Sequence, residues 1–167
     1  MIPLLVLSAA VLKALPDQIG GEGGESCEWV EVGVVARSLV DICEFIGKRD
    51  DGEWVYNIVH PKSFSWAKEF LPKLREAGMD FETVEYMEWL KKLSKSEVDV
   101  AKNPSKKLLG FWQSQGIRQS GLKEGVITFD TTSLIKISPT IKDAERVVDG
   151  QLVKEIVNAW REAGASI

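Results

Sequence analysis

The sequence has few of the residues that bind metal ions or form disulfides. Its 167 residues include two cysteines, Cys27 and Cys43, and one histidine, His60. A zinc site of the CxxC kind needs closely spaced cysteine pairs, and a disulfide framework needs more cysteines than these. We therefore expect no metal site, free thiols and a reducing, cytoplasmic setting.

Concentrated positive charge and long apolar runs are missing as well. Lys and Arg together number 21 and Asp and Glu 25, for a formal net charge of −4. The basic residues are spread along the chain, whereas binding to nucleic acid needs a concentrated basic face. The apolar segment 1–15 is too short to span a bilayer, and its one charge, Lys13, follows the apolar run. We therefore expect neither a nucleic-acid partner nor a membrane segment.

Three motifs of enzymes are also absent. The glycine-rich stretch 20–24 follows a predicted helix, so it does not match the strand–turn–helix in which Gly-x-Gly-x-x-Gly holds a dinucleotide. No Tyr-x-x-x-Lys pair occurs, because Tyr56 is followed four residues later by His60 and Tyr86 by Leu90. No Gly-x-Ser-x-Gly turn supports a hydrolase. The sequence thus predicts no catalytic residue and no cofactor site in this chain.

Hydrophobic periodicity predicts a mainly helical chain with a few short strands. Helices are expected at 3–15, 33–46, 65–77, 86–93, 103–116 and 151–163, with a loop at 115–125. Strands are expected at 29–32, 54–59 and 81–84. Pro16 is expected to end the first helix, and Pro72 to kink or divide the third. The alternation predicts one domain, residues 1–167, of the α/β to α+β class. It would be mainly helical, with one or two right-handed βαβ units packed by about six helices.

Polar and aromatic residues gather where the best predicted strand, 54–59, ends. Five of them are candidate substrate-binding residues: Asn57, His60, Ser63, Phe64 and Trp66. Open α/β sheets bind ligands beyond the carboxyl ends of their strands, and binding pockets combine apolar walls with a few polar groups. In the alternative, His60 is a hydrogen-bonded loop residue, and Phe64 and Trp66 fasten the next helix to the core. A third hypothesis pairs His60 with Ser63 or Ser65 in a small hydrolase.

Four stretches of sequence occur in a characteristic order: Ile2–Pro16, Trp29–Ile42, Val55–Arg75, and Phe129–Thr140 followed by a helix with Trp160. Together they resemble the C-terminal part of the terminal thioester reductase domains of fungal NRPS-like carboxylate reductases and polyketide synthases. These domains belong to the extended short-chain dehydrogenase/reductase group. Relatives usually read Trp-Leu-Pro-Val-Asp where this chain has Trp29-Val30-Glu31-Val32-Gly33. The missing aspartate is expected to weaken the start of the following helix.

The resemblance implies a two-part NADPH-dependent enzyme. A separate N-terminal Rossmann part would bind NADPH and carry the catalytic Tyr and Lys, so this chain would be inactive alone. This chain would bind the substrate and an acyl or peptidyl carrier domain, whose phosphopantetheine arm delivers a thioester that is released as aldehyde or alcohol. Apolar surface exposed where the Rossmann part docks, above all on helix 3–15, would favour self-association. The alternative is a stand-alone, non-catalytic protein-interaction module of the same fold.

Overall fold

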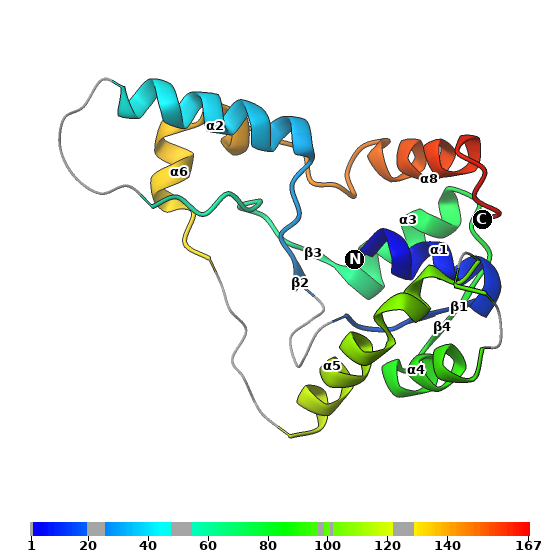
Figure 1. The fold of residues 1–167 in the computed structure, drawn as a ribbon. Coiled ribbons are helices and arrows are strands. Elements are labelled where there is room, and N and C mark those ends of the chain that lie inside the picture. Colours follow the sequence, from blue (N-terminus) through cyan, green and yellow to red (C-terminus); the bar gives the residue numbers. More distant parts are fainter. Residues whose placement is uncertain (1, 20–25, 48–54, 97–98, 101, 122–128) are drawn as a thin grey trace.

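The computed structural model describes residues 2–19, 26–47, 55–96, 99–100, 102–121 and 129–167, without the side chains of 116–121. These residues form two lobes (Figure 1). The large lobe contains α1 (Ile2–Leu12), β1 (Ala14–Pro16), β2 (Ser26–Cys27), β3 (Phe64–Ser65), the π-helical turn η1 (Trp66–Phe70), α3 (Leu71–Glu76), β4 (Glu82–Val84), α4 (Tyr86–Lys95), the 3-10 helix η2 (Pro104–Leu108), α5 (Leu109–Gly121) and α8 (Leu152–Glu162). The small lobe contains α2 (Val32–Ile46), α6 (Thr132–Ile137) and α7 (Pro139–Lys142).

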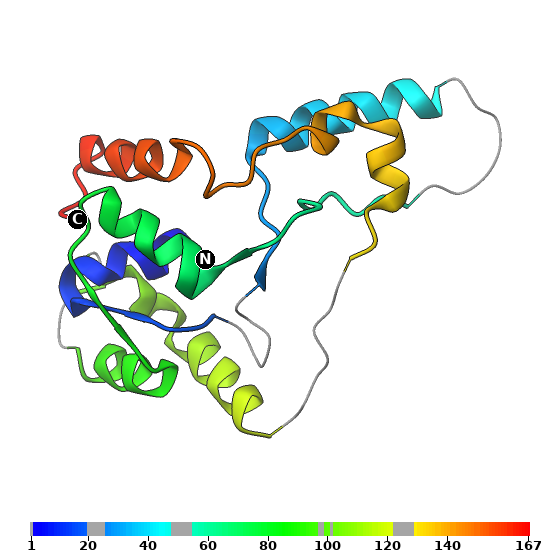
Figure 2. The same ribbon diagram turned by 180° about the vertical axis from the view of Figure 1, so that it is seen from behind.

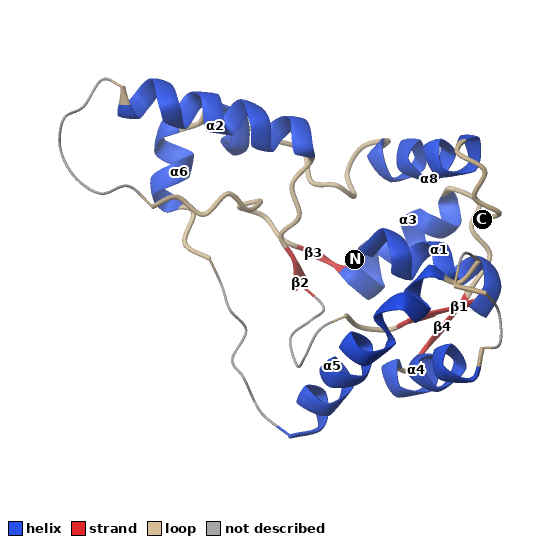
Figure 3. Ribbon diagram, viewed as in Figure 1, coloured by secondary structure: helices blue, strands red, loops and turns tan. Residues whose placement is uncertain are grey.

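The predicted fold class is confirmed. Helices dominate the described chain, and strands β1 and β4 form a small parallel pair in which Ala14 lies opposite Glu82 (Figure 3). Strands β2 and β3 form a second, antiparallel pair in which Cys27 lies opposite Phe64. The predicted strand 81–84 is confirmed as β4.

The predicted strands 29–32 and 54–59 are wrong over the residues described, which exclude Trp54. Residues 28–31 and 55–60 are loops, and α2 already begins at Val32. The side chains of Tyr56 and Ile58 pack on the small lobe's core instead. β-branched and aromatic residues favour a strand only where a neighbouring strand supplies backbone partners, so packing decides here.

Two helix ends differ from the prediction. Helix α1 ends at Leu12, because Lys13 has a left-handed backbone (φ 52°), and residues 14–16 form β1 rather than a last helical turn. Helix α5 continues to Gly121, past the end predicted near Gly116. The sequence signal for a loop there was polarity and glycine, neither of which forbids a helix on the surface.

The break predicted at Pro72 is confirmed. Ser65 caps the helix that begins at Trp66, its hydroxyl oxygen accepting a hydrogen bond from the Lys68 N–H at 3.1 Å. The first turn is π-helical, and regular α-helix begins at Leu71, with Pro72 in its first turn. Proline has no N–H and its ring displaces the carbonyl one turn earlier, so it fits at a helix start but not inside.

The core of the large lobe is rich in tryptophan. Trp66, Trp89 and Trp112 are fully buried, and α1 lies among the surrounding helices of this lobe (Figures 1 and 2). The expectation that α1 exposes apolar surface stays a prediction. Its residues Leu5, Val6, Ser8 and Ala9 are buried, Pro3 is exposed, and its other side chains are partly buried.

The small lobe has a smaller core and several polar caps. Val34, Ile42, Leu134 and Ile141 are its buried apolar side chains. Glu31 caps α2, with its carboxylate accepting hydrogen bonds from Gly33 N and Val34 N at 2.7 and 2.9 Å.

The cap at Glu31 corrects an expectation. The aspartate missing at position 33 does not leave α2 without a cap, because the carboxylate of Glu31 accepts hydrogen bonds from the first N–H groups of the helix. No helix in the described ranges is long and apolar enough to cross a membrane.

Candidate functional site

The two lobes meet where the chain passes between them, and His60 lies at this joint. Its backbone N–H donates to Glu28 O at 3.0 Å, and its Nε2 lies 3.2 Å from Ala144 O. Its Nδ1 accepts a hydrogen bond from Lys62 N at 3.0 Å, which places the ring proton on Nε2. His60 therefore links three passing segments while only 2% of it is exposed.

This geometry favours the structural alternative for His60. A general base needs a free ring nitrogen within hydrogen-bonding distance of the group that it deprotonates. Both ring nitrogens of His60 are engaged by backbone groups. The hydrolase hypothesis, which pairs His60 with Ser63 or Ser65, therefore has no support from the site.

Arg146 anchors the joint beside His60. Its guanidinium donates two hydrogen bonds to Asp149 Oδ1 and one to Asp149 Oδ2, and it lies 3.0 Å from Glu69 Oε1. It also donates to Ser63 O at 3.1 Å. Hydrogen bonding to Arg146 lowers the pKa of Asp149, and Asp149 and then Glu69 raise the pKa of Arg146. Arg146 thus pairs with Asp149 in the segment that follows α7 and with Glu69 in η1.

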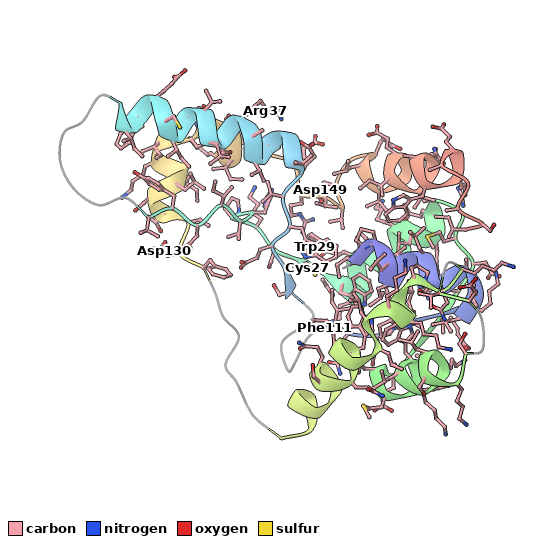
Figure 4. The ribbon with its side chains drawn as sticks, viewed as in Figure 1. Cys27, Trp29, Arg37, Phe111, Asp130 and Asp149 are labelled. Carbon is pink, nitrogen blue, oxygen red and sulfur yellow. The ribbon has the colours of Figure 1, made fainter. Side chains whose placement is uncertain are left out.

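Next to the joint lies a cluster of four aromatic rings. Trp29 makes edge contacts with Phe64 and Phe70, with ring centroids 5.3 and 5.2 Å apart. Trp66 stacks on Phe70 at 5.2 Å and donates from Nε1 to Pro16 O at 2.8 Å. Trp66 has no exposed surface, whereas Trp29, which lies near Cys27 (Figure 4), is partly exposed and packs against the core of the large lobe.

An apolar groove of about 390 Å³ opens on one side of this cluster. It lies between the start of α1, helix α3 and helix α8, and its walls are almost wholly apolar. Its lining residues are Ile2, Pro3, Trp29, Phe70, Leu74, Val147, Val153, Ile156 and Trp160. Helix α8 supplies one wall because its apolar residues recur at helical spacing and face α3.

A second, more polar cavity of about 290 Å³, wide open to solvent, borders the cluster at Phe64. Ser26, Ser63, Phe64, Ser65 and Glu69 line it. The two cavities share the aromatic cluster as a common wall, since Phe64 lines the polar cavity and touches Trp29 and Phe70 of the groove.

The five candidate residues lie in different surroundings. Ser63 and Phe64 line the polar cavity, while Trp66 is wholly inside the core. His60 sits in the joint, and Asn57 lies in the small lobe, where its Nδ2 donates to Asp130 O at 3.1 Å. Their role in substrate binding stays a prediction.

Sequence reasoning missed the groove because its walls come from three distant segments. Ile156 and Trp160 stand at helical spacing in the last helix, which indicates only that they share one face of it. Their neighbours across the groove, Ile2 and Pro3, lie at the other end of the chain. No single motif could have brought them together.

The residues at the carboxyl edge of the parallel pair do not fit NADPH. A dinucleotide's pyrophosphate binds where a helix begins after a strand, on free N–H groups and near glycine. Helix α4 does begin directly after β4, but Glu85 precedes it and Glu88 lies in its first turn. Two carboxylates there would repel a pyrophosphate. The described residues also contain no group of three or more His, Cys, Asp or Glu able to hold a metal ion.

Comparisons with known proteins give relatives but no family. No family model matches the chain. It is 29% identical to an adenylate-forming reductase of Heterobasidion annosum, over 98% of this chain and 15% of that protein. It is 28% identical to the citrinin polyketide synthase of Monascus ruber, over 96% of this chain and 6% of the synthase. A carboxylic acid reductase of Neurospora crassa is 27% identical over 95% of this chain and 15% of its own length.

The matches cover nearly all of this chain but only a small share of each relative. The chain spans about 15% of the length of the reductases and 6% of that of the synthase. It is therefore similar, along almost its whole length, to one segment of much longer fungal reductases and polyketide synthases.

Proposed function

We propose that this chain is the substrate-side part of an NADPH-dependent thioester reductase and that its own task is to hold the acyl group. The apolar groove between α1, α3 and α8 carries this proposal. Its volume of about 390 Å³ lies in the range of small-molecule pockets, which are mostly apolar with a few polar groups. The similarity to fungal reductases and polyketide synthases supports it.

The paired cavities suit a ligand with two chemically different ends. The acyl chain would lie in the groove against Trp29 and Phe70. The amide-bearing phosphopantetheine arm would lie in the polar cavity, where the hydroxyls of Ser26 and Ser63 could form hydrogen bonds with its amides. An apolar groove beside a cavity with hydroxyl groups matches such a thioester better than it matches either a sugar or a charged metabolite.

The cofactor and the catalytic Tyr and Lys would belong to a separate Rossmann part, and a carrier domain would deliver the thioester. The charges of Glu85 and Glu88 at the start of α4 support assigning NADPH elsewhere. When bound there, NADPH would supply the hydride. The residues of this chain would orient the acyl group and exclude water from it.

The test uses the protein as it is, with octanoyl-N-acetylcysteamine as a small thioester probe. Tryptophan fluorescence reports binding, because Trp29 and Trp160 line the groove. We expect saturable binding that the variant Ile156→Trp weakens about tenfold by filling the groove. The matched control is Asn158→Trp, which adds the same side chain on an exposed position of α8.

Two outcomes would contradict the proposal. The first is no saturable binding of the thioester to the unaltered protein, and the second is equal weakening by both variants. Saturable, micromolar NADPH binding to this chain alone would contradict the assignment of the cofactor to another part.

A second function is the interaction module predicted as the alternative. In that case the groove would receive apolar side chains of a partner protein, since its walls have almost no polar group to orient a small ligand. An amphipathic peptide that displaces the thioester probe in a competition titration, while the thioester alone binds only at millimolar concentration, would favour this alternative.

A further inference from the structure

The outer face of α2 carries an apolar stripe that no described part of the chain covers. With 3.6 residues per turn, Val32, Ala36, Leu39, Val40 and Cys43 fall on one side of the helix. All five are exposed, Val32 by 79%, Leu39 by 48% and Val40 by 55%. This side is opposite the buried row that faces α6 and α7. A stripe of this width normally faces a core.

Exposed apolar side chains are concentrated in the small lobe. Five of the seven large ones in the described chain belong to it: Val32, Leu39, Val40, Val55 and Phe129. The other two, Met87 and Phe111, lie on separate helices of the large lobe. Single apolar residues on a surface are ordinary, but a contiguous row marks an interaction surface.

Two opposite charges follow the same edge of this stripe. Arg37 and Glu44 are exposed and lie two helical turns apart on α2. The Arg37 guanidinium also lies 4.0 Å from the Glu31 carboxylate, so pairing with a second carboxylate would have to share or replace this contact. Figure 4 shows Arg37 on the side of α2 turned away from α6. The stripe thus has a positive group toward its start and a negative group toward its end, which makes it complementary to a reversed copy of itself.

We propose that two copies of this chain pair through α2, with the two helices antiparallel. In a pair centred between Leu39 and Val40, Ala36 faces Cys43 of the partner subunit. The same twofold arrangement brings Arg37 within reach of Glu44 of the partner subunit, and it forms this ion pair twice. A parallel pair would place the two charged edges on opposite sides, so the charges favour the antiparallel one.

The contact is small, so the dimer is expected to dissociate on dilution. The stripe runs from Val32 to Cys43, about 16 Å of helix at 1.5 Å per residue. Stable dimers usually bury about 800 Å² on each partner, more than one helix stripe provides. A reversible equilibrium between monomer and dimer therefore follows, and it does not depend on the thioester groove.

Sedimentation equilibrium of the full chain tests the proposal. The unaltered protein should change from monomer to dimer as its concentration rises. Val40→Glu should weaken the dimer about tenfold or more, because it places a carboxylate against the apolar stripe of the partner subunit. The matched control is Met87→Glu, an equally exposed apolar residue on the large lobe (52% against 55% exposed). It should leave the equilibrium unchanged.

Cysteine cross-linking tests the antiparallel register. Ala36→Cys places a thiol opposite Cys43 of the partner subunit, so mild oxidation should give a covalent dimer. The unaltered protein should not cross-link, because its two Cys43 thiols lie about 10 Å apart along the helices. Asn158→Cys, at an exposed position of α8, is the control for random collisions.

Three outcomes would overturn the proposal. The first is a monomer at every concentration, which would leave the stripe to a different partner. The second is equal loss of dimer with Met87→Glu. The third is a dimer in which the Ala36→Cys variant cross-links no faster than the Asn158→Cys control.

Discussion

The large lobe buries three tryptophans completely, whereas the described part of the small lobe has a core of four buried apolar residues. Carboxylates border the smaller core. Asp41 there accepts a hydrogen bond from the Ser138 hydroxyl at 2.6 Å, and Asp130 Oδ1 accepts one from Thr132 N at 2.8 Å. The comparison sets a large apolar core against a small one whose helices are bordered by hydrogen-bonded carboxylates. The two lobes should therefore differ in how much a core mutation destabilises them, in their stability to acid and in the reactivity of their thiols.

The largest effect is expected from Trp66→Ala. Trp66 is fully buried, stacks on Phe70 and donates to Pro16 O. Its truncation should lower the free energy of unfolding by about 3–5 kcal/mol, as for other large aromatic residues in cores. Denaturant unfolding followed by fluorescence measures this change.

The same variant separates core from substrate contact. In a reductase reassembled with its cofactor part, an unchanged KM for the thioester together with a lower Tm would place Trp66 purely in the core. A higher KM at unchanged Tm would contradict the structural role.

Ile141→Ala should destabilise the small lobe by about 2–4 kcal/mol, since Ile141 is fully buried in its core. The effect should be local. Amide hydrogen exchange should accelerate in α2, α6 and α7 and stay unchanged in α4. Equal acceleration in both lobes would show that they unfold as one unit.

Acid should loosen the small lobe before the core of the large lobe. Backbone hydrogen bonds from Gly33 and Val34 lower the pKa of Glu31, and the Ser138 hydroxyl lowers the pKa of Asp41. A depressed pKa means that the carboxylate form stabilises the fold. This stability is complete above the ordinary pKa and is lost as the pH falls through the folded-state pKa.

The acid effect can be measured by exchange or NMR between pH 5 and pH 2, the region below ordinary carboxyl pKa values. Signals of α2 and α7 should shift or broaden first. Glu31→Gln should make this change less dependent on pH, because it removes one of the groups that titrate. Simultaneous loss of both lobes would contradict the comparison.

The smallest expected effect is a difference in the rate at which a reagent modifies the two thiols, with no change in stability. Cys43 is exposed on α2, while Cys27 is buried in the large lobe, where loss of hydration raises its pKa to about 12. Thiolate is the reactive form, so at pH 8 an aromatic disulfide reagent should modify Cys43 rapidly. Cys27 should react only after unfolding. Rapid reaction of two thiols per chain would show that the large lobe opens readily.

Much of the helical structure could be predicted because its signals are local. Ser65 before Trp66, and Pro72 one turn later, determine the cap and the break through backbone chemistry within a few residues. The strand prediction for 54–59 was wrong because a strand depends on a partner elsewhere in the chain. Helices α6 and α7 were not predicted. They are only six and four residues long, too short for a periodic pattern.

The candidate site could be predicted only in part. Ser63 and Phe64 were singled out because they follow an apolar segment, and they do line a cavity. The groove itself depends on the contact between α3 and α8, which are far apart in the sequence. The self-complementary stripe on α2 is readable in the sequence as a row of apolar residues. Only the structure shows which side of the helix is already covered.

The path of the chain has a consequence for the order of folding. The chain leaves the large lobe after Cys27, returns at Phe64, leaves it again before α6 and returns before α8 (Figures 1 and 2). Helix α2 therefore meets α7 across about a hundred residues, as the hydrogen bond between Asp41 and Ser138 illustrates (97 positions apart). Closing so long a loop has an entropic cost. This cost is smaller once the intervening residues are already folded. We therefore expect the large lobe to fold first and the small lobe to form on it, and the small lobe cannot be excised as one continuous segment.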